Sequence, residues 1–256
     1  MWTNGRLVTG RSPRSAVRAA TVSGMPNRLA SVVVDVVDPA AAAEFWYVML
    51  GGTVVPEVGG GRRVVSPEIG VCDVDVVFLP SAAEKVGKNR IHVDLATESP
   101  HEYQVLTSLA MDLGAVAADG ETDLPWTVFH DPVGNEFCIL EPHELYSDTG
   151  PLAAIVIDAA DPVTLADFWS TTMSWPTVHH TADAVALRPA GTHGPWIEFL
   201  RAKDSAHIPN RIRFTVTSDT PRSLHGTAFT ATDPEGNEFH VHPAGHDANT
   251  PTRPRR

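Results

Sequence analysis

The sequences DPVGNEFCIL, at Asp131–Leu140, and DPEGNEFHVH, at Asp233–His242, state nearly the same local structure twice. Proline fixes φ at the second position of each segment, and glycine tolerates positive φ two residues later, so both segments predict a turn. Alternating apolar residues on either side of the turn indicate a β-hairpin. The first copy has Cys138 where the second has His240, a residue that can bind a metal or move a proton.

This repeat extends over most of the chain. ASVVVDVVDPAAAAEFWYVML, from Ala30, matches AAIVIDAADPVTLADFWSTTM, from Ala153, and KNRIHVDL, from Lys88, matches PNRIRFTV, from Pro209. The second copy is shorter between Thr217 and Thr227, where too few residues remain for a helix. We therefore predict a tandem duplication whose last unit is truncated to strand, loop and hairpin.

Each copy also contains two strand-helix-strands units. In the first unit Asp38 is placed to cap a helix whose first residue is Pro39, and Gly51 follows its end. In the second unit Ser99 and Glu102 form a capping box, and Gly114 ends the helix. The sequence thus predicts strand, helix and further strands four times over, which is an α+β fold.

Composition limits the classes of protein that remain. The 256 residues are 43% hydrophobic and 20% charged, the balance of a globular protein with a substantial core. No apolar run reaches the roughly 18 to 20 residues of a membrane span, and the net charge of −12 disfavours binding to nucleic acid or anionic membranes. Only two cysteines are present, without C-x-x-C spacing, so we expect a reducing, cytoplasmic location. Residues 1–24 and 246–256 are predicted to be a disordered or spurious leader and a disordered tail.

These repeated motifs resemble the vicinal oxygen chelate superfamily, in its glyoxalase-like branch. The resemblance implies two tandem domains, 25–146 and 150–245, each with two βαβββ modules that form a cup-shaped mixed sheet with helices outside. The superfamily includes glyoxalases, extradiol dioxygenases, thiol transferases, epimerases and metal-free bleomycin-binding proteins. The fold that the resemblance implies therefore leaves the chemistry open.

The resemblance also implies where metal ligands would stand in each cup. In the first domain these positions hold Ser31, Val77, Arg90 and Cys138, which do not make a metal site. In the second domain they hold Ala154, Glu198, Arg211 and His240. Glu198 and His240 are a possible divalent metal site, with His242 as a possible third ligand. Alternatively, Glu198 pairs with an arginine and His240 is simply a polar cup residue.

Alternation along the strands suggests a second set of site residues. Residues two apart share one face of a strand, so Arg90, His92 and Asp94 point the same way. We expect them to form one cluster with Asp35 and to bind a polar or anionic molecule, because arginine offers a bidentate fork. The equivalents in the second copy are Asp158, Arg211 and Arg213. The alternative is that Asp35–Arg90 and Asp158–Arg211 are structural salt bridges.

Two functions follow from these alternatives. The first is metal-independent binding of a small polar or anionic organic molecule in the cup, with Cys138 as an inert buried thiol and Trp126 and Trp196 able to stack on the ligand. The second is a metal-dependent lyase, isomerase or dioxygenase acting from the C-terminal cup. A homodimer is also possible, because the truncated last unit would leave apolar surface for another subunit to cover.

Overall fold

A computed structural model describes residues 27–67, 74–118, 124–189, 191, 194–202, 210–218 and 228–244. The predicted leader, the tail and the segment 219–227, on which the truncated last unit depends, lie outside the described residues. The first quarter of the fold comprises β1 (Arg28–Val36), α1 (Pro39–Leu50), β2 (Thr53–Pro56), η1 (Val58–Gly60), β3 (Arg62–Val65) and β4 (Asp75–Pro80). The second comprises β5 (Ile91–Leu95), α2 (Pro100–Asp112), β6 (Val116–Ala117), β7 (Trp126–His130) and β8 (Glu136–Leu140).

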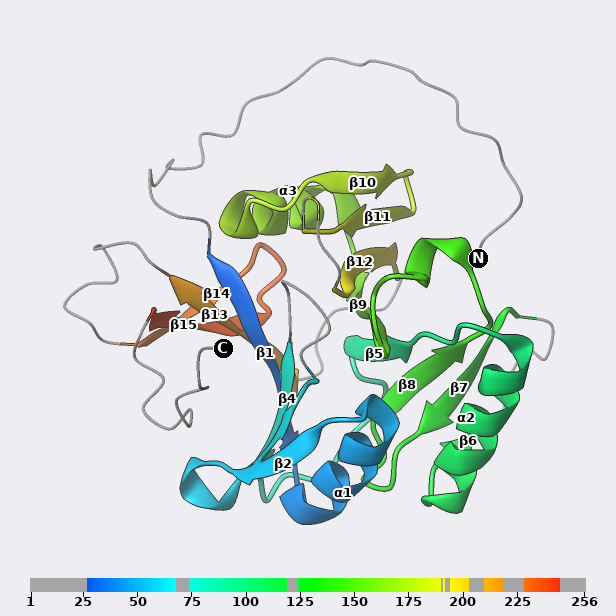
Figure 1. Ribbon diagram of the computed structural model, residues 1–256. Coiled ribbons are helices and arrows are strands. Elements are labelled where there is room, and N and C mark those ends of the chain that lie inside the picture. Colours follow the sequence, from blue (N-terminus) through cyan, green and yellow to red (C-terminus); the bar gives the residue numbers. More distant parts are fainter. Residues whose placement is uncertain are drawn as a thin grey trace, which may run out of the picture.

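After the short helix η2 (Glu144–Tyr146), the same order begins again. The third quarter comprises β9 (Leu152–Ala159), α3 (Pro162–Met173), β10 (Thr177–His180), β11 (Ala184–Leu187) and β12 (Trp196–Arg201). The fourth comprises β13 (Ile212–Ser218), β14 (Phe229–Thr232) and β15 (Glu238–Pro243). Figure 1 shows the helices of the described residues and the strands arranged in two sheets. We call the four quarters modules 1 to 4.

Local capping confirms the helix predictions. The side chain of Asp38 accepts hydrogen bonds from the backbone N–H groups of Ala40 and Ala41, Pro39 opens α1, and Gly51 ends it with φ of 68°. Ser99 likewise accepts from the N–H of Glu102 at the start of α2. Each cap satisfies backbone groups that would otherwise lack partners at a helix end.

The two sheets combine modules in an unexpected order. The seven-stranded sheet A runs β14-β15-β13-β1-β4-β3-β2 and joins module 1 to module 4, because β1 pairs antiparallel with β13. The eight-stranded sheet B runs β10-β11-β12-β9-β5-β8-β7-β6 and joins module 2 to module 3, because β5 pairs antiparallel with β9. The α+β class with two mixed sheets is confirmed, but each sheet takes one module from each half of the sequence.

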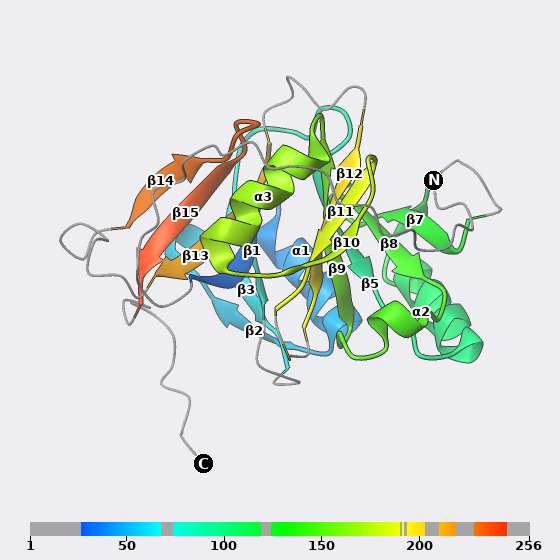
Figure 2. The same ribbon diagram turned by 90° about the horizontal axis from the view of Figure 1, so that it is seen from above.

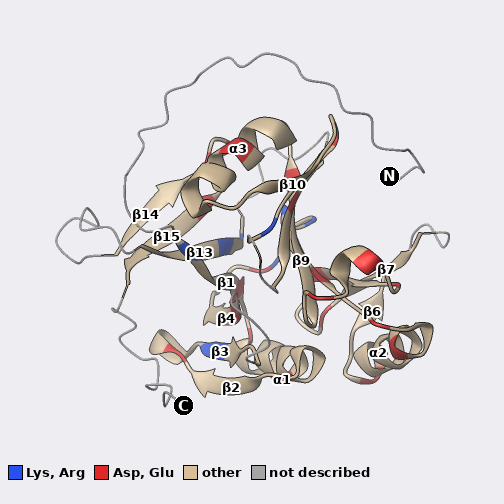
Figure 3. Cartoon of the chain, turned by 45° about the horizontal axis from the view of Figure 1, so that its top comes forward, with Lys and Arg blue, Asp and Glu red and all other residues tan. Residues whose placement is uncertain are grey.

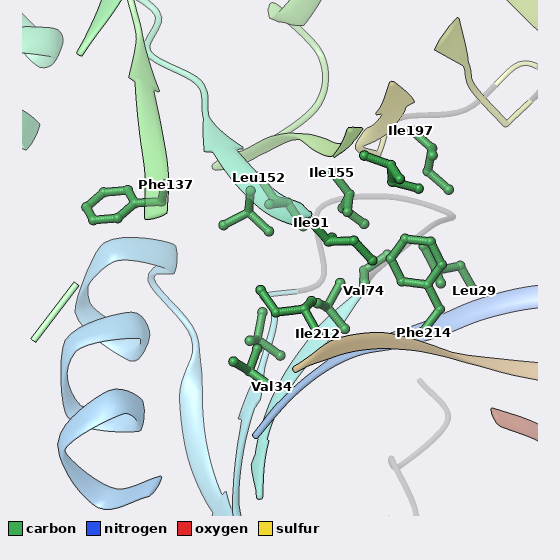
Figure 4. Packing of buried hydrophobic residues seen from close by; sticks show 14 of the residues in the cluster. Leu29, Val34, Val74, Ile91, Phe137, Leu152, Ile155, Ile197, Ile212 and Phe214 are labelled. Carbon is green, nitrogen blue, oxygen red and sulfur yellow. The ribbon is translucent and has the colours of Figure 1, made fainter. Parts of the chain in front are cut away.

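One apolar core fills the space between the sheets. Val34, Ile212 and Phe214 of sheet A face Ile91 and Ile155 of sheet B, as Figure 4 shows, and all of them belong to a single buried cluster. Since strand residues alternate, the other face of each sheet points away from this core. We call these the outer faces. In Figure 2, seen from above, α3 lies in front of α1, with β13 and β15 of sheet A to the left and β9 and β12 of sheet B to the right.

The repeated motifs meet in one hydrogen-bond chain in each half. Trp46 Nε1 of α1 donates to Asp131 Oδ2 at 2.9 Å, and Asn135 Nδ2 donates to the same oxygen at 3.2 Å. Asn89, from KNRIHVDL, donates from Nδ2 to Asn135 Oδ1 at 3.1 Å. These contacts explain why Phe-Trp, Asp-Pro and Asn-Arg recur together, since they tie module 1 to the hairpin of module 2.

The second half repeats this chain with its own residues. Trp169 Nε1 donates to Asp233 Oδ2 at 3.3 Å, Asn237 Nδ2 donates to the same oxygen at 2.8 Å, and Asn210 Nδ2 donates to Asn237 Oδ1 at 3.2 Å. α1 and α3 therefore connect modules that follow each other in sequence, whereas the pairs β1–β13 and β5–β9 connect modules of different halves.

Candidate functional site

The outer face of sheet B carries two rows of side chains that cross the sheet. Strand register aligns Trp196, Ala154, Asp94 and Cys138 in one row, from β12 through β9 and β5 to β8. The second row aligns Glu198, Val156 and His92. Small side chains on β9 therefore form a floor between a polar group on β5 and β8 and another on β12. Neighbouring strands are about 4.8 Å apart, so the two groups stand roughly 10 Å from each other along a row.

His92, Asp94 and Cys138 form the first polar group. Their ligand-type atoms all lie within 4.8 Å of one another, and His92 Nε2 is 3.4 Å from Asp94 Oδ1. They meet because His92 and Asp94 are two residues apart on β5, while Asp94 and Cys138 are paired across to β8. Asp94 and Cys138 are buried, at 8% and 5% exposure.

Burial keeps these three groups uncharged near neutral pH. It lowers the pKa of His92 to about 4, helped by the nearby charge of Lys88. Burial raises the pKa of Asp94 to about 8, and the charge of the nearby Glu198 carboxylate adds to that rise. The pKa of the Cys138 thiol is raised as well, by burial and by Asp94. The His92–Asp94 contact is therefore a contact between neutral groups rather than an ion pair.

Glu198, Trp196 and Arg188 form the second polar group, covered by Tyr146 from η2. Tyr146 donates its hydroxyl to Glu198 Oε1 at 2.8 Å and meets the Trp196 ring edge-on, with centroids 5.7 Å apart. Burial raises the pKa of Glu198 although the Tyr146 hydrogen bond acts in the opposite direction. The Arg188 guanidinium lies 5.6 Å from the Trp196 ring centroid and pairs with Asp148.

Several buried polar atoms on this face have no hydrogen-bond partner among the described residues. They include Trp196 Nε1, Arg188 Nε and His92 Nδ1. The first two can only donate, so each needs an acceptor atom. A buried donor without an acceptor costs about 1–3 kcal/mol, and native proteins contain few of them.

The first polar group also fits a divalent metal ion in its donor chemistry. Imidazole, carboxylate and thiolate are all ligands of zinc and related ions, and catalytic sites commonly use three protein ligands. Within the parts of the chain that the structure describes, His92, Asp94 and Cys138 are the one set of three such residues close enough together. Binding would require Asp94 and Cys138 to lose their protons.

The outer face of sheet A has a different chemistry. Asp35 accepts two hydrogen bonds from Arg213, at 2.7 and 3.0 Å, in a bidentate ion pair. His240 stands beside Thr215 in the strand register, and its pKa is lowered by burial and then by the charges of Arg213 and His242. This face therefore carries a charged Asp35–Arg213 pair where the equivalent part of sheet B carries neutral groups.

The structure separates residues that the sequence analysis brought together. Asp35 lies on sheet A, whereas His92 and Asp94 lie on sheet B, so the predicted cluster of these residues with Arg90 is wrong. Arg90 instead pairs with Glu235 at 2.8 Å. The strand pairing between halves is the reason, because it places β1 and β5 in different sheets.

The other predicted pairs change for the same reason. Asp158 pairs with Lys88 at 2.6 Å rather than with Arg211, and Arg211 donates to the backbone oxygen of Asp35. Glu198 is on β12 of sheet B and His240 on β15 of sheet A, so they do not form a common metal site. In the same way, Ser31 and Val77 lie on strands of sheet A, while Cys138 lies on β8 of sheet B and Arg90 directly precedes β5 of sheet B. These four residues therefore do not line a common cup.

Two residues of the sheet B face were missed from the sequence. Arg188 follows β11 and continues the alternation of Ala186, a signal that could have placed it on this face. Tyr146 lies in the connection between the halves, where no periodic pattern marks it. His92 was expected only as part of the misplaced cluster, yet it stands seven residues before the cap Ser99, as Ser31 stands seven before Asp38.

The protein-family model described as a glyoxalase-like domain matches residues 31–140 and 154–231 of this chain. The chain belongs to this family. Glyoxalase I from Zea mays has a similar structure, with a TM-score of 0.62 at 11% identity over 85% of this chain and 92% of that one. A putative dioxygenase from Bacillus subtilis subsp. subtilis str. 168 gives a TM-score of 0.59 at 15% identity over 86% of both chains. No curated protein matches the sequence.

Identities this low show a shared fold and do not transfer an activity. The family assignment confirms two glyoxalase-like repeats in the vicinal oxygen chelate superfamily. None of the described helices is long and apolar enough to cross a membrane.

Proposed function

We propose that this glyoxalase-like protein binds a small polar or anionic organic molecule on the outer face of sheet B. The observation that carries the proposal is the pair of buried donors, Trp196 Nε1 and Arg188 Nε, for which the described part of the chain supplies no acceptor. Both are donor-only groups, so a metal ion cannot satisfy them, whereas a carboxylate or carbonyl oxygen can.

The shape of this face supports a ligand with a flat body. Ala154 and Val156 have short side chains between the two polar groups, and both are buried in the cluster against which Tyr146 packs. The Tyr146 ring packs against both small apolar clusters on this face, which shows that an aromatic ring fits against these side chains. A bound molecule would lie with its acceptor oxygens toward Trp196 and Arg188 and its body toward Cys138 and His92.

A thermal-shift screen with aromatic and aliphatic carboxylic acids tests this proposal. We expect at least one acid to raise the melting temperature of the wild type and of the control Arg62→Met. Arg62 hydrogen-bonds the backbone oxygen of Gly61 on sheet A, away from the site. Trp196→Phe and Arg188→Met should lose the response because each removes one donor. An undiminished response in both variants would contradict the proposed orientation.

A second candidate function is favoured by the spacing of His92, Asp94 and Cys138. If these residues held a divalent cation, it would polarise an oxygen of a bound substrate, as a lyase, an isomerase or a dioxygenase requires. The site would then be in sheet B, formed by modules 2 and 3, rather than in the C-terminal cup.

Elemental analysis of protein purified without chelator separates the two candidates. Stoichiometric zinc, nickel, manganese or iron that is lost in both His92→Ala and Cys138→Ser would favour the metal-dependent enzyme. Metal content that is absent from the wild type, together with acid binding in the presence of EDTA, would favour metal-independent binding.

Two further expectations remain proposals. We infer a cytoplasmic location, because the buried cysteine Cys138 is a free thiol in the structure. We also propose a homodimer, which light scattering at several protein concentrations would test; a monomer at all concentrations would contradict it.

A further inference from the structure

A cavity of about 310 Å³ is lined by residues from both halves of the chain and by none of the sheet B site. Its walls come from the connection 81–90, which joins β4 to β5, from the residues that open β13, and from Asp35 near the end of β1. Its volume is at the lower end of the range for small-molecule pockets. None of the residues assigned above to ligand binding on sheet B lines it.

Basic side chains dominate the lining. Lys85, Lys88, Arg90 and Arg211 contribute four positive charges, against the carboxylates of Asp35 and Glu84. The Asp35 carboxylate is already bound at both oxygens by Arg213. Figure 3 shows the basic part of β13 near the middle of the molecule, while acidic residues are spread over the helices and outer strands.

Three of the four basic residues have carboxylate partners, and Arg211 does not. Lys85 pairs with Glu136, Lys88 with Asp158, and Arg90 with Glu235. Among the described residues, the Arg211 guanidinium donates only to the backbone oxygen of Asp35, and its buried Nη1 has no acceptor. Arg211 is partly buried, and its Nη1 is a buried charged donor without an acceptor, so an anion at this place would stabilise it.

The backbone that presents these residues is held in place by the repeated Asn-Arg motif. Asn89 and Asn210 also line the cavity, but their amide groups donate to Asn135 and Asn237 at 3.1 and 3.2 Å. The two asparagines thus fix the segments that carry Arg90 and Arg211. A site whose donors are fixed before binding loses less entropy when its ligand arrives.

We propose that this cavity is a binding site for a small dianionic molecule whose phosphate or carboxylate oxygens are held by Arg211 and Lys88. Arg211 supplies a planar fork that matches an oxyanion in two hydrogen bonds. Lys88 is 58% exposed at its side chain, so its ammonium group can turn from Asp158 toward a ligand at small cost.

Calorimetric titration of the full chain with inorganic phosphate, glycerol 3-phosphate and succinate tests the proposal, with sodium chloride keeping the ionic strength constant. We expect at least one of these dianions to bind, and Arg211→Met to weaken it at least tenfold. Lys88→Met should weaken it less, and Arg28→Met, which changes an exposed residue at the start of β1, should leave it unchanged. Tightest binding of glycerol 3-phosphate would identify a phosphate ester as the ligand class, and tightest binding of succinate an organic diacid.

The proposal is overturned if no dianion binds the wild type, or if Arg211→Met binds as tightly as Arg28→Met. Arg211→Lys keeps the charge but not the fork and provides the same comparison if Arg211→Met does not fold. Trp196→Phe should retain dianion binding here, so failure of this proposal is distinguishable from failure of the one for sheet B.

Discussion

Replacing Asp131 with alanine should cost roughly 3–5 kcal/mol of folding free energy. Asp131 is 3% exposed and accepts four hydrogen bonds: from Trp46 Nε1 at 2.9 Å, from Asn135 Nδ2 at 3.2 Å, and from the backbone N–H groups of Val133 and Asn135 at 3.1 and 2.8 Å. Alanine leaves these donors without an acceptor. Trp46 and Asn135 are themselves 4% exposed, so water cannot replace the lost partner without rearrangement.

The magnitude depends on how many donors are stranded. A buried donor without an acceptor costs about 1–3 kcal/mol, and at least two such donors remain after the substitution. Asp131→Asn keeps one acceptor oxygen and should cost less, about 1–2 kcal/mol. Burial raises the pKa of Asp131, although its hydrogen bonds from Trp46, Asn135 and Val133 act in the opposite direction.

Urea unfolding followed by tryptophan fluorescence and by circular dichroism measures these changes. Asp167→Ala, on an exposed position of α3, is the matched control and should change stability by less than about 0.5 kcal/mol. A double-mutant cycle of Asp131→Asn with Trp46→Phe should show a coupling energy of about 1 kcal/mol. A loss below about 1 kcal/mol in Asp131→Ala would refute the view that the repeated motifs form a structural network.

Three further predictions follow from the sheets and their outer faces. Burial raises the pKa of Asp94 from 3.8 to about 8, so its contribution to stability is full at acid pH and is lost as pH rises toward 8; in EDTA, Asp94→Asn should remove this slope from urea midpoints, and an unchanged slope would contradict it. The Asp35–Arg213 pair, with side chains 32% and 14% exposed, should give a coupling energy of about 1–2 kcal/mol in a double-mutant cycle of Asp35→Asn with Arg213→Met. Additive effects of the two substitutions would contradict this prediction. A fragment ending at Tyr146 should not form a compact monomer, because β1 and β5 would lose β13 and β9; a folded monomer in gel filtration and circular dichroism would show that the two halves are independent.

The elements of the fold were predictable because their signals are local. Asp38, Pro39 and Gly51 fix the ends of α1 through capping and backbone geometry alone. The turn chemistry of the Asp-Pro segments fixes both hairpins in the same way. Which strand pairs with which is not a local property. The apolar face of β1 would be buried equally well whether β1 paired with β5 or with β13. Sequence alternation therefore gave the correct face of Asp35 and His92 but not the correct neighbours.

The exchange of modules between the halves gives equivalent positions on the two sheets separate environments. The row Ala154, Asp94, Cys138 on sheet B corresponds to the row Ser31, Thr215, His240 on sheet A. Next to these rows, His92 on sheet B corresponds to Arg213 on sheet A, since each precedes its row neighbour by two residues.

An arginine at that position repels a cation and cannot act as its ligand, whereas a neutral histidine can do so. The change from Cys138 to His240 therefore places a possible ligand beside an arginine, whose charge opposes a cation on that face. A cation that entered sheet B would meet a neutral imidazole, a carboxyl group and a thiol, each able to become a ligand. Among the described residues, the three possible metal ligands that lie within 4.8 Å of one another are on sheet B, and the same face carries the unsatisfied donors Trp196 Nε1 and Arg188 Nε. Substitutions at Arg188 and at His92 are expected to separate these two capacities.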